Sequence, residues 1–334
     1  MVMDDSFYHG VVCAELGPPE RLQLRRLQRG PLAPGMVRVK LMAAGINFPD
    51  LLMIRGKYQH RPDLPFVPGM EGAGFVVETA PDVHAPVTGQ KVMVSMRTGG
   101  YAQEAVVPAD RVIPLPAGFS FLEGATFLVA HITAYHALAT RAVLASGQML
   151  LVLGAGGGVG LAAVQIGKAL GGRVIAAAST EDKLRIAQKC GADHLINYAE
   201  EPVDAGVRRL TSGAGVDVVF DPVAIEQDSA LRCVAYNGKL LIVGFAGGMI
   251  PAYAANRILL KGCSVIGIRA GEAGRRNPEM RQRELETLGA LAAQGIARPL
   301  VSASYPLHRY AEAMQLLGSR QAIGRVALTI DGNV

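Results

Sequence analysis

The pattern of hydrophobic and polar positions changes near residue 125. Before that point, short β-rich segments at 35–46, 72–80, 90–96 and 101–116 are separated by glycine and proline turns. Segments of this kind predict the strands of an irregular antiparallel barrel. After residue 275, a helical stretch is followed by strand-like segments at 297–307 and 324–330 of the same character. We therefore expect the chain to return at its end and complete the first domain.

Between these regions, continuous apolar runs alternate with helical stretches. The runs are "MLLVLG" (149–154), "RVIAAA" (173–178), "HLIN" (194–197), "VDVVF" (216–220), "KLLIVGF" (239–245) and "CSVIGI" (263–268). Strands buried on both faces and joined by helices are typical of a doubly wound parallel sheet. The sequence thus predicts an α/β protein with a six-stranded Rossmann sheet at 125–268, and a barrel domain formed by 1–124 and 269–334.

Composition agrees with two folded domains and narrows the function classes. The 334 residues are 50% hydrophobic and 18% charged, and the net charge of +5 comes from lysines and arginines spread along the chain. Dispersed basic residues do not indicate a nucleic-acid surface, and no run of residues predicts a membrane span. Four widely separated cysteines and an acidic N-terminus without a targeting pattern favour a reducing, cytoplasmic location.

The segment "GAGGGVG" (154–160) carries the strongest local chemistry. It stands at the end of the first sheet strand and the start of a helix, where glycines let the backbone approach a pyrophosphate and the helix N-terminus attracts the anion. Because the βαβ pattern is present on both sides, the segment predicts dinucleotide binding. The residues expected at the cofactor are Gly154, Gly157, Gly158, Val159 and Gly160.

The end of the second strand indicates which dinucleotide is bound. NAD sites usually place a carboxylate there, about 20 residues beyond the glycines, but the chain has no Asp or Glu from Leu161 to Thr180. It has Ser179 at the strand end and Lys183 one turn into the next helix. A hydroxyl and a cation suit a 2′-phosphate, so NADPH is favoured over NADH, although Glu181 and Asp182 count against an anion.

Several of these motifs together resemble the medium-chain dehydrogenase/reductases, and specifically their zinc-free quinone oxidoreductase branch related to ζ-crystallin. The resemblance rests on segments that span nearly the whole chain: "AAGINFPDLLMIRGKYQ" (43–59), "PFVPGMEGAGFV" (65–76), "GAGGGVGLAAVQIGKALGGRVIA" (154–176), "CGADHLINY" (190–198), "GVDVVFDPV" (215–223) and "GRVALTI" (324–330). It implies that the barrel is a GroES-like catalytic domain.

The resemblance also implies that a catalytic metal has been lost. Zinc alcohol dehydrogenases of this superfamily have a metal-binding histidine at the position of Met70 and a metal-binding cysteine at that of Asn47. A thioether and an amide do not replace imidazole and thiolate in such a site. Asn47 and Tyr58 are the catalytic residues that the resemblance suggests, with Asn47 near the nicotinamide ribose or the acceptor oxygen and Tyr58 as a proton donor. Asp50 and Glu71 are interpreted as ion-pair or turn residues.

Further cofactor contacts follow from the same resemblance: Asn47, Thr133, Tyr198, Gly244, Phe245, Ile268 and Arg320. The segment at 261–271 is a candidate edge strand whose counterpart in relatives pairs across a two-fold axis, so a homodimer is expected.

Three functions remain open at this point. The first is a zinc-independent, NADPH-dependent reductase that delivers hydride to a quinone. The second is a reductase for enones or enoyl thioesters, for which Arg55, Lys57, His60 and Arg61 offer basic residues near the pocket mouth. The third is a structural, crystallin-like protein that holds NADPH and turns over only incidentally.

Overall fold

The computed structural model describes residues 6–225 and 228–330, which divide into two compact units. The first unit contains residues up to Val129 and from Leu300 onward, and the second contains Ala130–Pro299. Residues 269–299 therefore make most of their contacts with the second unit. The domain boundaries expected from the sequence, which group 269–334 with the first domain, stay a prediction.

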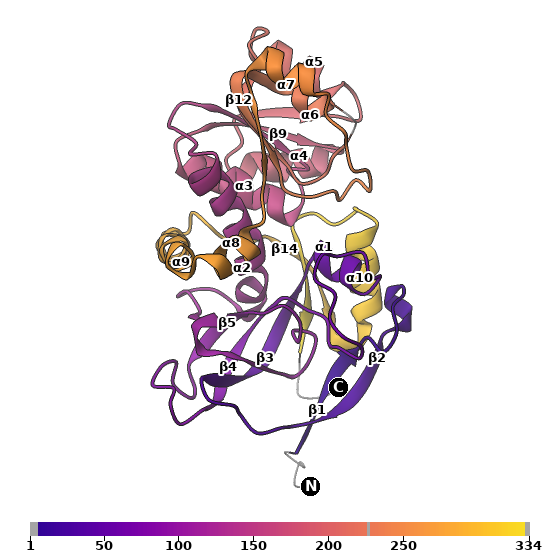
Figure 1. The fold of residues 1–334 in the computed structure, drawn as a ribbon, viewed down its shortest axis with the longest axis vertical. Coiled ribbons are helices and arrows are strands. Elements are labelled where there is room, and N and C mark those ends of the chain that lie inside the picture. The colour runs from indigo at the N-terminus through magenta and orange to yellow at the C-terminus, as the bar shows by residue number, and fades with distance from the viewer. Residues whose placement is uncertain (1–5, 226–227, 331–334) are drawn as a thin grey trace. The chain divides into compact units, whose positions relative to one another are not determined.

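The first unit is built on a seven-stranded sheet (Figure 1). Its strands run in the order β14-β15-β3-β4-β5-β7, and β6 also pairs with β3. The elements of this unit are β1 (Phe7–Val12), β2 (Gln23–Gln28), β3 (Met36–Ile46), α1 (Phe48–Met53), β4 (Glu71–Thr79), β5 (Lys91–Ser95), β6 (Glu104–Pro108), β7 (Val112–Pro114), β14 (Val301–Pro306), α10 (Tyr310–Gly318) and β15 (Arg325–Thr329).

The end of the chain returns to this sheet as expected. β15 pairs antiparallel with β3, the longest strand of the unit, so residues near 325 lie beside residues near 46. The pairing of β14 with β15 is parallel, whereas the sequence pattern predicted an antiparallel barrel throughout. The physical reason is that α10 lies between these two strands in the chain, and a helical crossover joins parallel strands.

The second unit contains the predicted six-stranded sheet, and all of its pairs are parallel. The strand order is β10-β9-β8-β11-β12-β13, which is the doubly wound order of a dinucleotide-binding fold. The strands are β8 (Met149–Leu153), β9 (Arg173–Ala178), β10 (His194–Asn197), β11 (Val216–Asp221), β12 (Val234–Ile242) and β13 (Ser264–Gly267). All five residues of β8 are buried, as its place between β9 and β11 requires.

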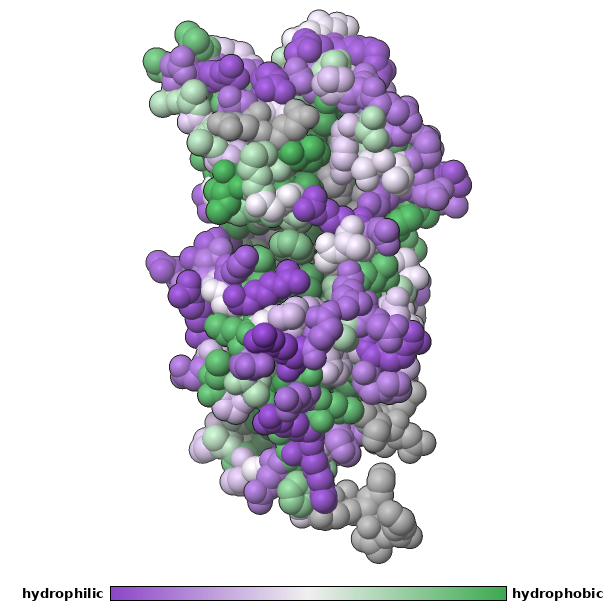
Figure 2. All heavy atoms as spheres, turned by 90° about the vertical axis from the view of Figure 1, so that its right-hand side faces the viewer, coloured by the Kyte–Doolittle hydropathy of each residue, from purple (hydrophilic) through white to green (hydrophobic). Residues whose placement is uncertain are grey.

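Helices connect these strands and cover the sheet. They are α3 (Gly158–Ala169), α4 (Glu181–Lys189), α5 (Val203–Leu210), α6 (Ser229–Cys233) and α7 (Ala255–Lys261), whereas α8 (Ala270–Arg276) and α9 (Pro278–Ala293) follow the last strand, β13. α2 (Phe121–Tyr135) begins in the first unit and ends in the second. Within the described residues, no helix combines the length and the apolar character needed to cross a membrane. Figure 2 shows hydrophilic and hydrophobic residues interspersed over one face of the molecule.

Candidate active site

Asn47 and Glu71 meet inside the first unit because their strands are neighbours. Asn47 follows β3 and precedes α1, and Glu71 is the first residue of β4, which pairs with β3. The side chains of both residues are buried, and Asn47 Nδ2 donates a hydrogen bond to Glu71 Oε1 over 3.0 Å. Asn47 Nδ2 also contacts the carbonyl oxygen of Gly45, at a longer 3.4 Å.

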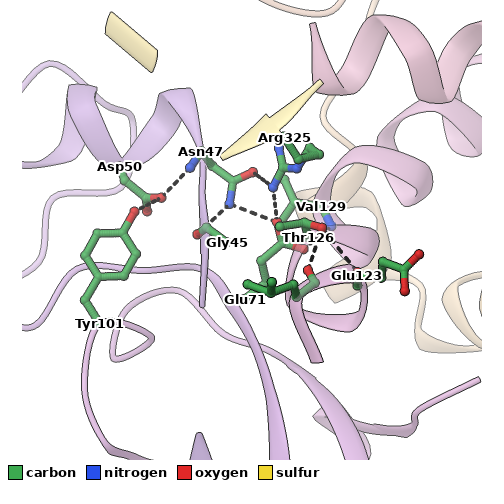
Figure 3. Close-up of polar contacts among 10 residues, drawn as sticks. Gly45, Asn47, Asp50, Glu71, Tyr101, Glu123, Thr126, Val129 and Arg325 are labelled. Carbon is green, nitrogen blue, oxygen red and sulfur yellow. Dashed lines mark hydrogen bonds and ion pairs between the residues drawn. The ribbon is translucent and has the colours of Figure 1, made fainter. Parts of the chain in front are cut away.

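Arg325, at the start of β15, completes this arrangement from the other end of the chain. Its Nη2 donates to Asn47 Oδ1 over 2.9 Å and forms an ion pair with Glu71 Oε1. The second carboxylate oxygen of Glu71 accepts a hydrogen bond from the backbone N–H of Val129 over 2.9 Å. Burial raises the pKa of Glu71, and the neighbouring Arg325 guanidinium opposes that rise. We call these three residues, Asn47, Glu71 and Arg325, the Asn47 cluster (Figure 3).

Asp50 and Tyr101 form a second buried pair next to the Asn47 cluster (Figure 3). Asp50 Oδ2 accepts from the Tyr101 hydroxyl over 2.8 Å and from the backbone N–H of Asn47 over 2.9 Å. Its other oxygen, Oδ1, is buried and has no hydrogen-bond partner among the described residues. Burial raises the pKa of Asp50 to about 7, well above that of an exposed aspartate.

These residues do not fit a catalytic zinc ion. The positions at which the resemblance implies ligands are Asn47 and Met70, and the Met70 side chain packs against the hydrophobic core of the first unit. Glu71, which follows Met70 in the chain, already carries the guanidinium of Arg325 as its counter-charge. Zinc in proteins is held by thiolate, imidazole or carboxylate, and in the described part of the chain no three such groups are grouped closely enough to hold a metal.

The glycine segment forms the tight turn that was predicted between β8 and α3. Gly154 has φ +61°, a conformation that favours glycine, and a Cβ on Gly160 would lie 2.3 Å from the carbonyl oxygen of Gly154. Gly160 therefore lets α3 begin directly against the end of β8. α3 has no side-chain N-cap, so its first backbone N–H groups, at Gly158 and after, are available to an anion.

Ser179 and Lys183 lie together at the end of β9. Lys183 Nζ lies 3.5 Å from Ser179 Oγ, and Thr180 between them caps α4 by accepting from the backbone N–H of Lys183. The aliphatic stem of Lys183 lies across Gly156, where a Cβ would come within 2.5 Å of it. Partial burial lowers the pKa of Lys183. The glycine pattern gave no sign of this contact, because it depends on how α4 packs on the turn.

Four of the other expected cofactor residues of the second unit lie at the carboxyl end of the parallel sheet. Tyr198, Gly244, Phe245 and Ile268 follow the carboxyl ends of β10, β12 and β13. Open parallel sheets bind their ligands at the carboxyl ends of their strands. Thr133 is half-buried in α2. Tyr58, half-buried, and Arg320, which follows α10 with φ +61°, belong to the first unit. Cofactor contact by these residues stays a prediction.

Sequence reasoning missed Arg325 and Tyr101. The only signal for Arg325 is a charged residue at the start of an otherwise apolar final segment, "GRVALTI". The interpretation of Glu71 as an ion-pair residue agrees with its contact with Arg325.

The raised pKa of Asp50 predicts how stability depends on pH. Because the folded-state pKa, about 7, lies above the ordinary 3.8, the folded protein keeps a proton that the unfolded chain releases between these values. The contribution of this group is therefore full below about pH 4 and falls by roughly 1.4 kcal/mol per pH unit up to about pH 7. In D50N, which retains an acceptor for Tyr101 and for the backbone of Asn47, this dependence should disappear.

Urea denaturation of the wild type and D50N from pH 5 to 8 measures the difference. The exposed Asp63 supplies the matched control, D63N, which should follow the wild type. A difference in unfolding free energy between the wild type and D50N that is constant over this pH range would contradict the assignment.

Comparisons with known proteins agree with this geometry. The family model described as an alcohol dehydrogenase GroES-like domain matches residues 33–117, and the one described as zinc-binding dehydrogenase matches 158–289. The chain is 36% identical over 324 residues to the quinone oxidoreductase-like protein 2 homolog of Nematostella vectensis, covering 96% of this chain and 88% of the other. It is 32% identical over 335 residues to the quinone oxidoreductase of Lama guanicoe, covering 99% and 100%.

Solved structures show the same relationship. The quinone oxidoreductase of Escherichia coli, solved in complex with NADPH, superimposes with a TM-score of 0.87 at 28% identity and covers 96% of this chain and 99% of the other. The family expected from the sequence is therefore confirmed, along with the α/β fold class. The chain is an oxidoreductase that belongs to the quinone oxidoreductase-like branch of the medium-chain dehydrogenase/reductases.

Proposed function

We propose that the protein is a zinc-independent, NADPH-dependent reductase that delivers a hydride to a quinone. The observation that carries this proposal is the Asn47 cluster, in which a carboxylate and a guanidinium satisfy the amide of Asn47, one of the two positions where the resemblance implies a zinc ligand. That donor set supplies no Lewis acid to bind an alkoxide. The acceptor must then already be electrophilic, as a quinone is.

The chain's own residues hold the cofactor and orient the acceptor. The backbone of Gly154, Gly157, Gly158, Val159 and Gly160 receives the pyrophosphate, and Ser179 with Lys183 receives the 2′-phosphate. When bound, NADPH supplies the hydride. Negative charge then collects on the acceptor oxygen, where Tyr58 is the proposed proton donor; its ordinary pKa near 10 must be lowered for that step to be fast.

Support for NADPH comes from the neighbours as well as from the chain. The Escherichia coli quinone oxidoreductase and the mycobacterial protein Rv1454c, which is 28% identical to this chain with a TM-score of 0.87, were both solved with NADPH. In this chain, a hydroxyl and an ammonium group lie together at the end of β9, which suits an anionic group better than a ribose hydroxyl.

A reductase for enoyl thioesters is the second candidate. The observation that favours it is the exposure of Arg55, Lys57 and Arg61, three cations in the segment after α1. Exposed basic residues attract the phosphates of a coenzyme A thioester.

The rate of NADPH oxidation against an ortho-quinone, a simple enone and a short enoyl-CoA tests these functions, with NADH run in parallel. Efficient turnover of the quinone alone supports the proposal. If enoyl-CoA is reduced at least tenfold faster, the quinone proposal is wrong and the second candidate replaces it. Tight NADPH binding with negligible turnover of every acceptor would instead indicate a structural, crystallin-like role.

Cofactor choice is tested by replacing Ser179 and Lys183 together with alanine. Each charge-assisted contact to a phosphate contributes about 1.5–3 kcal/mol, so S179A/K183A should bind NADPH at least tenfold more weakly, with NADH affinity nearly unchanged. Fluorescence titration of both cofactors measures this effect. K189A removes an exposed lysine from the same helix and is the matched control. Unchanged NADPH affinity in S179A/K183A would remove this account of specificity.

A homodimer through β13 is part of the proposal. β13 is at the edge of its sheet, and an unpaired edge favours pairing with a second copy. Large apolar side chains on or near the adjoining α7 and β12 are also highly exposed: Tyr236, Ile250, Leu259 and Leu260. A cytoplasmic location stays a prediction.

Sedimentation analysis should give twice the mass of one chain for the wild type. L259E/L260E should shift the protein to the monomer, because these side chains are 79% and 77% exposed in one chain and would be buried in the dimer. V87E, which alters an exposed residue of the first unit, is the control. A monomeric wild type at micromolar concentration contradicts the dimer.

A further inference from the structure

Arg325 is a buried cation without an assigned role. It is 6% exposed and begins β15, whose next three residues, Val326, Ala327 and Leu328, are fully buried. Its Nη2 lies between two acceptors, Asn47 Oδ1 and Glu71 Oε1. A cation is costly at such a position unless its partners require it.

The contacts of Arg325 and Glu71 allow only one direction of the Asn47 amide. A guanidinium can only donate hydrogen bonds and an ionised carboxylate can only accept them. Asn47 therefore turns Oδ1 to Arg325 and Nδ2 to Glu71. If the amide were rotated by 180°, Nδ2 would face the donor group of Arg325, and Oδ1 would face the acceptor oxygen of Glu71. Both contacts would be repulsive in a buried site that water does not screen.

Arg325 is also needed to keep Glu71 in the form that imposes this direction. Burial favours the protonated form of Glu71, and Arg325 is the first of the groups that oppose it. A protonated carboxyl both donates and accepts, so it could pair with either end of the amide. Removal of Arg325 therefore releases the Asn47 amide in two ways, by removing the donor at Oδ1 and by allowing Glu71 to be neutral.

The locked amide has a defined hydrogen-bonding capacity left. Oδ1 can accept two hydrogen bonds, and within the described residues only Arg325 occupies it. The two hydrogens of Nδ2 face Glu71 at 3.0 Å and Gly45 at 3.4 Å. The hydrogen-bonding position that stays open on the amide is therefore one acceptor site on Oδ1. A ligand hydroxyl group can donate a hydrogen bond to this site, whereas a ligand carbonyl oxygen cannot.

We propose that Arg325 is a positioning residue that acts through Asn47, by fixing the amide so that its carbonyl oxygen accepts a hydrogen bond from a hydroxyl group of the bound cofactor. This proposal rests on the proposed function in one respect, namely that Asn47 contacts the ligand. It assigns Asn47 a hydroxyl partner rather than the acceptor oxygen of a quinone.

The test compares R325M, R325K and E71Q/R325M with the wild type. R325M should weaken NADPH binding or lower kcat/KM at least tenfold, and R325K, which retains a charged donor, should stay within about threefold of the wild type. E71Q/R325M removes both charges together. It should recover most of the thermal stability lost in R325M without recovering the function, because glutamine accepts either amide direction.

Arg38 on β3 offers a control variant that also removes a buried, ion-paired arginine. Arg38 is 3% exposed and pairs with Glu78 and Glu104, so R38M also removes a buried guanidinium from the first unit without touching the Asn47 cluster. R38M should lose stability but retain cofactor binding and kcat/KM per folded molecule. If R325M binds and turns over as R38M does, or if E71Q/R325M recovers full function, Arg325 is only structural.

A second readout separates this proposal from the proposed function. In protein labelled with ¹⁵N-asparagine, the side-chain amide signal of Asn47, identified by its loss in N47L, should shift in R325M and stay in place in R38M. NADPH binding and this signal are measured without any acceptor. Wild-type protein that reduces no acceptor would thus contradict the proposed function alone, whereas an unchanged signal in R325M would contradict the role of Arg325 alone.

Discussion

The ion pair between Glu71 and Arg325 is the interaction on which the candidate active site depends. Glu71 is fully buried at the start of β4, and only a strong counter-charge makes an ionised carboxylate tolerable there. The same guanidinium reaches Asn47 at the end of β3, so one cation ties together residues from three strands of the sheet. Without it, β4 would begin with a buried acid that lacks its counter-charge, and the amide of Asn47 after β3 would have no fixed direction.

This arrangement agrees with the proposal that the site works without zinc. Replacing a thiolate and an imidazole by Asn47 and Met70 removes both the ligands and most of the negative charge that a dication would neutralise. Glu71 is left over, and Arg325 neutralises it with a single positive charge. The buried carboxyl group of Asp50 has no such ion-pair partner among the described residues. Burial raises its pKa to about 7, so this group can instead be protonated and neutral.

The sequence predicted those features that depend on neighbouring residues. The apolar runs located the six parallel strands, and the glycine segment located the turn between β8 and α3, because both patterns are local. Arg325 and Tyr101 were missed because they meet Glu71 and Asp50 across 254 and 51 residues of chain, and no local pattern records such a pairing. The parallel pairing of β14 with β15 was missed for a related reason, since a strand pattern does not reveal its direction.

The return of the chain to the first unit also affects the order in which the protein can be completed during synthesis. The second unit is one continuous segment, Ala130–Pro299, so every residue it needs has been translated before β15 is made. The first unit is interrupted, and its longest strand lacks the neighbour β15 until residues 325–329 are translated. Glu71 must therefore wait for its counter-charge through most of translation, and the candidate active site is the last part of the sheet to be assembled.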